Sequence, residues 1–280
     1  MLCISPLRLK EGTVVSCGRC MPCRISRVRA WTIRILMEFH SFNENGLFVT
    51  LTYDDEHLPA GSTLVKSDLQ KFIKRLRRDV EPRKIKYFAC GEYGTQTQRP
   101  HYHLIILGLN NNDCDLIKEN WLYCNWRYMQ CSAIGSVTAD SIQYVCGYVQ
   151  KKIYGNKSKK EYEESGRIPP FQLQSQGLGL KYCQENLFEY INTKGIPYKN
   201  HIAPFPRYFK EKLEDKFPLN FFEELQKEIE PDLYKLYLEK CRTAWKNGKH
   251  GKDFHEAVYQ TERTEENYKR RFELTKRGKL

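Results

Sequence analysis

The sequence lacks several features that would assign it to common classes of protein. No apolar run approaches the roughly 18 residues of a membrane-spanning helix, and the start, Met1-Leu-Cys-Ile-Ser-Pro6, lacks the apolar core of a signal peptide. There is no Gly-x4-Gly-Lys-Ser/Thr sequence, so we expect no ATP-driven helicase within the chain. We therefore expect a soluble, intracellular protein without membrane contact.

Cysteine is abundant, but its arrangement does not suggest a disulfide framework. The chain has 11 cysteines, an odd number, so reduced thiols are expected. Four of them cluster as Cys3 and Cys17-Gly-Arg-Cys20-Met-Pro-Cys23. Four thiolates at this spacing can bind structural Zn²⁺ and fold an element that could not bury a core by itself. The alternatives are an iron–sulfur cluster, binding through only three thiols, or uncoordinated thiols.

Basic residues outnumber acidic residues. Lys and Arg total 46 against 34 Asp and Glu, which gives a net charge of +12 and a pI of about 9.1. This balance suits a polyanionic partner, because Lys and Arg that neutralise phosphates release counterions. The hydrophobic content of 40% argues against wholesale disorder, and 280 residues allow one or two domains.

A candidate metal site lies in the segment Arg99-Pro-His-Tyr-His-Leu-Ile-Ile-Leu-Gly108. If this segment is a strand, His101 and His103 point to the same face and can hold one ion. The run Lys84–Tyr93 predicts a second strand, and an antiparallel hairpin with Glu92 opposite His101 adds a carboxylate to that face. Two imidazoles and one carboxylate suit Mg²⁺ or Mn²⁺ acting as a Lewis acid. The alternative is a pair of ordinary surface histidines.

Two tyrosines lie four residues apart in a predicted helix, Tyr144-Val-Cys-Gly-Tyr148-Val-Gln-Lys151. At about 100° per residue the apolar stripe of this helix consists of Ile142, Val145, Val149 and Ile153. Both tyrosines and Lys151 fall on the opposite side. A phenol, with a pKa of about 10, is a poor nucleophile unless a cation or base is near, and Lys151 can be that cation. The alternative is that both tyrosines are half-buried against the sheet with hydrogen-bonded hydroxyls.

Three motifs occur in the order used by HUH endonucleases that initiate rolling-circle DNA replication. They are Phe48-Val-Thr-Leu-Thr-Tyr53, Arg99-Pro-His-Tyr-His103 and Tyr144-x-x-x-Tyr148-Val-x-Lys151. The chain resembles the replication initiators of small single-stranded-DNA microviruses, and its pattern is nearest the gokushovirus type. The resemblance begins at the cysteine cluster, continues through Gln174-Ser-Gln-Gly-Leu-Gly-Leu180, and ends near residue 215 after Pro206-Arg-Tyr-Phe209.

The resemblance implies an enzyme that nicks and rejoins single-stranded or unwound origin DNA with the help of a metal ion. His101 and His103 match the family's metal-binding histidines, and Glu92 matches its carboxylate. Tyr144 and Tyr148 match the paired tyrosines, one of which keeps the 5′ end as a phosphotyrosine ester and leaves a free 3′ hydroxyl. The implied partners are origin DNA, a host helicase and a host polymerase, in the cytoplasm of an infected bacterium.

The order of predicted elements indicates an α+β fold. Predicted helices cover Arg24–Phe39, Lys66–Val80 and Leu116–Cys124 and resume near Ala139, while predicted strands cover Gly46–Tyr53, the metal hairpin and Trp126–Cys131. This order suits an antiparallel sheet with helices on one face and the site on the other. It also matches the ferredoxin-like or RRM-like core that the resemblance implies.

Four regions are expected along the chain. They are a Cys-rich zinc element with a basic helix at 1–45, an endonuclease core at 46–155, a mobile loop at 156–170 and a mainly helical, basic C-terminal region at 171–280. A rival function is a non-catalytic, zinc-containing nucleic-acid-binding regulator whose tyrosines stack on bases. A third is a metal-dependent hydrolase that cuts without a covalent intermediate.

Overall fold

A computed structural model describes most of the chain and divides it into two compact units. The described residues are 3, 7–10, 14–94, 96–126, 133–148, 161–162, 164–225 and 246–248. The sheet unit spans Arg27–Leu187, and the terminal unit comprises the described residues of 1–26 and 188–280. Among the described residues, no helix is both long and apolar enough to cross a membrane.

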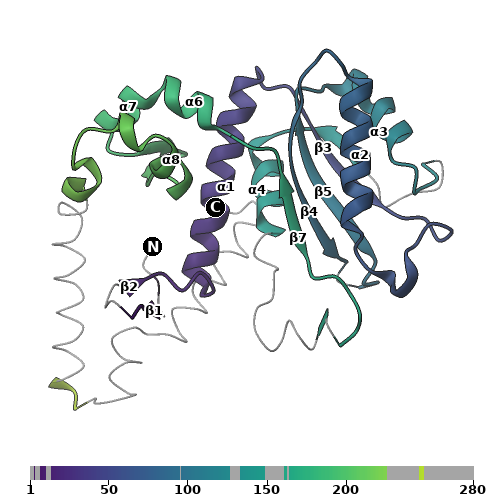
Figure 1. Ribbon diagram of the computed structural model, residues 1–280, viewed down its shortest axis with the longest axis horizontal. Helices are drawn as coiled ribbons and strands as arrows, with labels where there is room; N and C mark the ends of the chain where they lie inside the picture. Colours follow the sequence, from purple (N-terminus) through teal and green to yellow (C-terminus); the bar gives the residue numbers. More distant parts are fainter. Residues whose placement is uncertain are drawn as a thin grey trace. The chain divides into compact units, whose positions relative to one another are not determined.

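A five-stranded antiparallel sheet forms the centre of the sheet unit (Figure 1). Its strand order is β6-β3-β5-β4-β7, with β3 at Gly46–Thr52, β4 at Lys86–Tyr93, β5 at Pro100–Leu107, β6 at Ala133–Ser136 and β7 at Phe171–Gln174. The predicted first strand and metal hairpin are thus confirmed. Most of the predicted strand Trp126–Cys131 lies outside the described residues, and the observed edge strand β6 follows it in the sequence.

The register of the hairpin is the predicted one. In the pairing of β4 with β5, Glu92 stands opposite His101 and Cys90 stands opposite His103. On the other side of β5, strand β3 places Thr50 opposite His103. The histidine strand is therefore the middle strand of the sheet, with a neighbour on each side that can contact the imidazoles.

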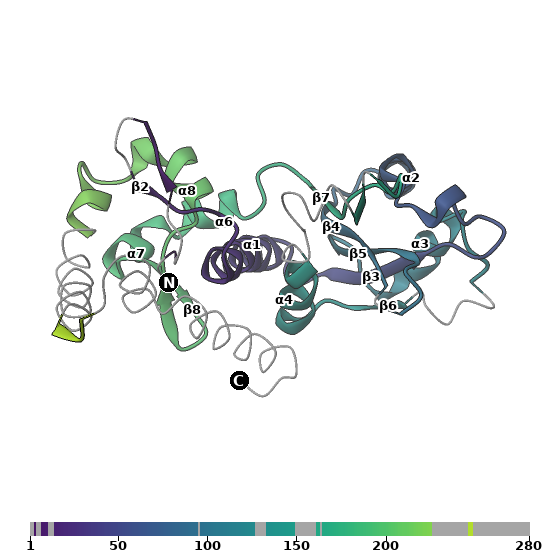
Figure 2. The same cartoon turned by 90° about the horizontal axis from the view of Figure 1, so that it is seen from below.

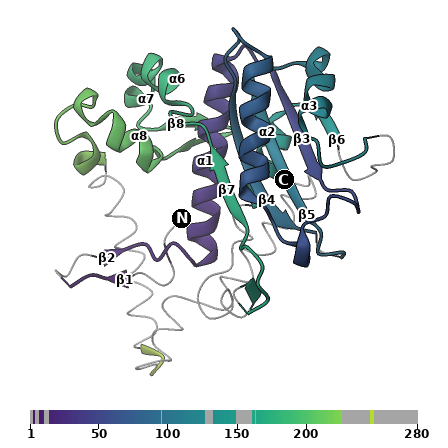
Figure 3. The ribbon, with the colours of Figure 1, turned by 45° about the vertical axis from the view of Figure 1, so that its right-hand side comes forward.

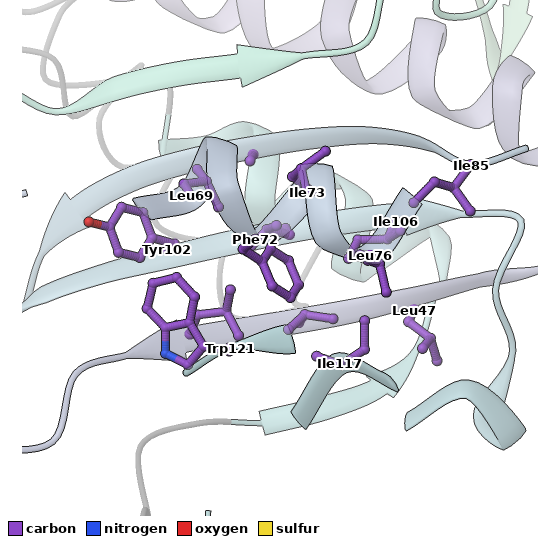
Figure 4. Close-up of a cluster of buried hydrophobic side chains, with 14 of the residues drawn as sticks. Leu47, Leu69, Phe72, Ile73, Leu76, Ile85, Tyr102, Ile106, Ile117 and Trp121 are labelled. Atoms are coloured by element: carbon purple, nitrogen blue, oxygen red, sulfur yellow. The ribbon is translucent and has the colours of Figure 1, made fainter. Parts of the chain in front are cut away.

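Helices α2 (Lys66–Asp79) and α3 (Cys114–Asn120) cover one face of the sheet. Helix α2 buries Leu69, Phe72, Ile73 and Leu76, which follow the i, i+3, i+4, i+7 spacing of an amphipathic helix. Figure 4 shows these side chains packed with Ile117 and Trp121 against Leu47, Tyr102 and Ile106 of the sheet. Burial of each large apolar side chain stabilises the fold by about 1.5–3 kcal/mol.

Helices α1 (Met21–Ser41) and α4 (Ala139–Gly147) pack against the other face, on the opposite side of the sheet from α2 (Figure 2). Ile35 of α1 and Val145 of α4 are fully buried there with Ile105 and Leu107 of β5. The α+β antiparallel fold is confirmed, but the expectation of helices on one face only is wrong. The reason is that β5 is apolar on both faces over Leu104–Leu107, so both faces need cover.

The segment Gln174–Leu180, part of the predicted family resemblance, is fastened to α1. The Glu38 carboxylate accepts a hydrogen bond from the Gly179 amide at 2.6 Å and pairs with Lys86 at 2.8 Å. Gly179 has a φ of +74°, and a Cβ there would lie 2.5 Å from the carbonyl oxygen of Arg34. Only glycine fits this close approach, which explains the Gly-Leu-Gly sequence.

The remaining elements are short. The sheet unit also contains the 3₁₀ turns Ala60–Ser62 and Asn111–Asp113 and helix α6 (Leu180–Glu185). Figure 3 shows the terminal unit, with β1 (Leu7–Arg8) beside β2 (Val14–Val15), α7 (Leu187–Asn192), β8 (Ile196–Tyr198), its partner β9 (His201–Ala203), α8 (Arg207–Lys212) and the turn Glu214–Lys216. The predicted C-terminal helices correspond to α8 and to a helical turn over 221–225, beyond which the described residues resume only at 246.

Candidate active site

His103 and Glu92 form a buried pair on the face that α1 and α4 cover. Their exposed fractions are 6% and 5%, and His103 Nε2 lies 3.2 Å from Glu92 Oε1. The other ring nitrogen, Nδ1, lies 3.2 Å from the hydroxyl oxygen of Thr50. Both nitrogens of His103 therefore have an oxygen partner, one from each neighbouring strand.

His101 lies one strand position closer to the hairpin turn and is less buried than His103. Its Nε2 faces Gly94, where an added Cβ would lie only 3.0 Å away. Among the described residues, only the clustered cysteines bring ligand atoms of three or more His, Cys, Asp or Glu side chains within 4.8 Å of one another. The structure thus brings Glu92 and His103 into contact but does not gather all three predicted ligands.

Helix α4 carries the two tyrosines to this pair. A capping box between Thr138 and Ser141 starts the helix, and Ile142 and Val145 are fully buried, as the predicted apolar stripe requires. The helix ends at Gly147, and Tyr148 follows it directly.

Both tyrosine rings lie against His103. The Tyr148 ring stacks on the imidazole with centroids 4.2 Å apart and planes inclined by 4°. The Tyr144 ring meets the same imidazole edge-on at 5.9 Å and is 50% exposed. The two tyrosine hydroxyls contact each other. Segments far apart in the sequence therefore converge on one imidazole.

The surroundings of Tyr148 disfavour its ionised form. Burial raises the pKa of the Tyr148 phenol, and its hydrogen bond with Tyr144 and the negative charge of Glu92 act in the same direction. A phenol held protonated in this way is a poor nucleophile at neutral pH. Any role for Tyr148 as a nucleophile therefore requires a positive charge near Glu92.

One predicted residue cannot be placed, and one residue was missed. Lys151 lies outside the described residues. Thr50 was not predicted as a site residue, although it belongs to the Phe48–Tyr53 motif. Its contact with His103 depends on the pairing of β3 with β5, and these strands are separated by α2 and β4. A long-range pairing of this kind leaves no local sequence signal.

The four clustered cysteines form a second group in the terminal unit. Their sulfur atoms all lie within 4.8 Å of one another, and the cluster could hold a metal ion such as zinc. Burial by itself would raise the pKa of Cys17, but hydrogen bonds from the Cys20 and Arg19 amides and from neighbouring thiols lower that pKa to about 7. Burial raises the pKa of Cys23 to about 12. The predicted ligands Cys3, Cys17, Cys20 and Cys23 are thus brought together.

Comparison with known proteins shows the family of the chain. Residues 46–153, which contain every predicted residue of the histidine and tyrosine site, match the family described as replication-associated protein ORF2. The chain is also 32% identical over 239 residues to replication-associated protein ORF2 of Spiroplasma virus 4, covering 77% of this chain and 73% of that protein. The chain belongs to this family of replication-associated proteins.

Two further relatives extend the family assignment. Replication-associated protein VP4 of Bdellovibrio phage phiMH2K is 30% identical over 233 residues, covering 74% of this chain and 70% of that protein. Replication-associated protein ORF4 of Chlamydia phage 1 is 30% identical over 236 residues, covering 76% and 58%. The resemblance to microvirus replication proteins that the motifs predict is confirmed. No solved structure matches the chain.

Proposed function

We propose that the chain is a rolling-circle replication initiator that nicks and rejoins single-stranded or unwound origin DNA through a phosphotyrosine intermediate. The stacking of Tyr148 on His103, with Glu92 in contact with that imidazole, carries this proposal. A metal-ligand set and two candidate nucleophiles share one place on the sheet. The relatives are named replication-associated proteins of phages and a virus, which supports a role in initiating replication and binding of origin DNA.

The contact between Glu92 and His103 fits a shared ion. Two ligand atoms, each about 2.1 Å from an ion and at right angles to one another, lie about 3.0 Å apart. The observed separation of 3.2 Å between Oε1 and Nε2 is close to this value. His101 lies on the same face and would join as the third ligand by turning its ring. The donor set of two imidazoles and one carboxylate suits Mg²⁺ or Mn²⁺, which would supply a positive charge at the scissile phosphate.

Thr50 can set the imidazole of His103 for this task. A neutral imidazole binds an ion through the nitrogen that carries no proton, so Nε2 is available only when the proton is on Nδ1. The Thr50 hydroxyl lies 3.2 Å from Nδ1 and can accept that proton's hydrogen bond. Thr50 is therefore a positioning residue for the nitrogen that faces Glu92.

The tyrosines perform the strand transfer. One hydroxyl loses its proton as its oxygen bonds to the scissile phosphorus, and the bond from phosphorus to the 3′ oxygen breaks. The 3′ oxygen takes up a proton and becomes the free end that a host polymerase extends. Since the hydroxyls of Tyr144 and Tyr148 are in contact, the second can attack the same region and release the first. Lys151, three residues after Tyr148, is the proposed cation beside them.

Cleavage in denaturing gels tests this function. Protein carrying both Tyr144→Phe and Tyr148→Phe should form no covalent adduct with labelled single-stranded origin DNA in the presence of Mn²⁺, whereas the unmodified chain should give a protein-shifted band. A shifted band from the double variant would contradict the proposal. Cut DNA without any shifted band would instead indicate direct hydrolysis, and uncut DNA with retained binding would indicate a non-catalytic regulator.

A further inference from the structure

The cysteine cluster lies where the fold has little else to hold it together. Cys3 precedes β1, Cys17 and Cys20 flank a tight turn after β2, and Cys23 lies in the first turn of α1. Strands β1 and β2 have only two residues each. A hairpin this short buries no core of its own, so another interaction must hold the segment in place.

The spacing of the sulfur atoms fits one tetrahedral ion. With bonds of about 2.3 Å, four thiolates around zinc lie about 3.8 Å from one another. The sulfurs of Cys3 and Cys20 are 3.7 Å apart, and all four lie within 4.8 Å of one another. An iron–sulfur cluster binds its thiolates through separate iron atoms, which requires a wider arrangement. The geometry thus favours a single ion among the alternatives left by the sequence.

Backbone amides point at the sulfur atoms as they do around a bound anion. The amides of Arg19 and Cys20 donate to the sulfur of Cys17 at 3.4 and 3.3 Å, and the Cys17 amide donates to the sulfur of Cys3 at 3.3 Å. Such donors orient metal-bound thiolates and offset their negative charge. The positive φ of Gly18, at 70°, allows the chain to turn tightly between Cys17 and Cys20.

We propose that Cys3, Cys17, Cys20 and Cys23 bind one Zn²⁺ in a closed, structural site that ties the N-terminal segment to the first turn of α1. Four protein sulfurs fill the tetrahedral positions, so neither water nor DNA can bind this ion. The site is therefore separate in chemistry from the oxygen- and nitrogen-rich site at His103, and the proposal stands whether or not the tyrosines cut DNA.

Metal analysis of the purified full chain tests the zinc site. We expect one zinc per chain, a loss of that zinc in Cys20→Ser, and an unchanged content in the control Cys114→Ser, whose half-buried thiol lies outside the cluster. Cobalt-substituted protein should show intense sulfur-to-cobalt absorption. If Cys20→Ser fails to fold, Cys23→His should keep one zinc and shift the cobalt spectrum. Zinc-free or iron-containing native protein, or zinc retained by Cys20→Ser, would overturn the proposal.

An independent observation concerns the outer surface of α2. Lys66, Lys71 and Lys74 are exposed there, and among the described residues the structure records no ion pair for any of them. The acidic residues of α2 are engaged elsewhere: Asp68 accepts hydrogen bonds from two tyrosine hydroxyls, and Asp79 pairs with Arg78. The outer surface of α2 is therefore positively charged over a helix about 21 Å long.

This surface lies on the opposite face of the sheet from α4 and its tyrosines (Figure 2). A strand held at the tyrosines cannot also lie along α2 unless the DNA extends around the sheet. We propose, building on the function above, that the outer surface of α2 binds the phosphate backbone of origin duplex flanking the nicked strand. The unpaired lysines fit a polyanion, and they carry no sequence preference of their own.

Salt-dependent binding tests the α2 surface. Lys71→Gln with Lys74→Gln should reduce the slope of log affinity against log salt for origin duplex by about 1.8, at about 0.9 per lost contact. The control, Lys118→Gln with Lys181→Gln, removes two lysines that already pair with carboxylates and should change the slope little. Cleavage of a short single strand should be unchanged in both. An unchanged slope in the α2 variant would overturn the proposal, whereas uncut short DNA from the native chain would contradict the nicking function instead.

Discussion

The two faces of the central sheet differ although they share the same strand, β5. On the face under α2, Tyr102, Leu104 and Ile106 are completely buried in an apolar core. On the opposite face the alternating residues begin with His101 and His103 and become apolar only at Ile105. One face is thus devoted to stability, while the other gives up part of its apolar packing for a polar site. The comparison predicts that substitutions on the two faces will separate folding from chemistry.

The largest expected effect is on the histidine face. His101→Ala should abolish cleavage of labelled origin DNA, because the proposed ion would lose its third ligand, while the free energy of unfolding should change by only about 1 kcal/mol. Denaturant unfolding and denaturing gels on the same preparation measure both quantities. Salt-sensitive DNA binding should persist, and its loss together with unfolding would show that His101 is a structural residue.

The α2 face should respond in the opposite way. Phe72 is fully buried against Trp121, with ring planes inclined by 84°. Phe72→Ala should lower the free energy of unfolding by about 3–5 kcal/mol, through lost burial and the cavity left behind. The folded fraction should still form the tyrosine adduct under conditions where the variant remains folded. A variant of normal stability that cannot cleave would break the comparison between the faces.

A smaller effect is expected at Thr50. Thr50→Val keeps the shape of the side chain but removes the hydroxyl that contacts Nδ1 of His103. Binding of Mn²⁺, measured by calorimetry, should weaken by about 10–100-fold, the usual effect of removing a residue that orients a metal ligand. Thr50→Ser should restore most of the affinity, because it returns the hydroxyl. Equal metal affinity in Thr50→Val and the native chain would exclude the positioning role.

The sequence was sufficient for the parts of the site that depend on local geometry. Glu92 and His101 belong to one hairpin, so two strand predictions and a short turn were enough to pair them. Helix α4 begins at Ala139, as its periodicity predicts. The cysteine cluster was also recognisable, because three of its members lie within seven consecutive residues.

Other features depend on contacts between distant segments. Strand β7 joins the sheet edge beside β4 after a long excursion of the chain, and no pattern in its four residues announces that pairing. The sequence placed both tyrosines away from the helix's apolar stripe, which is correct for the exposed Tyr144. Tyr148 nevertheless becomes partly buried, because it follows the last residue of α4 and rests on His103. That contact links α4 to the middle of the sheet and could not be read from α4 alone.

The most direct test of the central claim is to locate the covalent bond. After reaction with single-stranded origin DNA and Mn²⁺, nuclease trimming and proteolysis, mass spectrometry should find a nucleotide attached to the peptide that contains Tyr144 and Tyr148. Fragmentation should place the phosphodiester on one of these two phenolic oxygens. A nucleotide on any other residue, or cleaved DNA with no modified peptide, would contradict the proposal that the tyrosines beside His103 perform the chemistry.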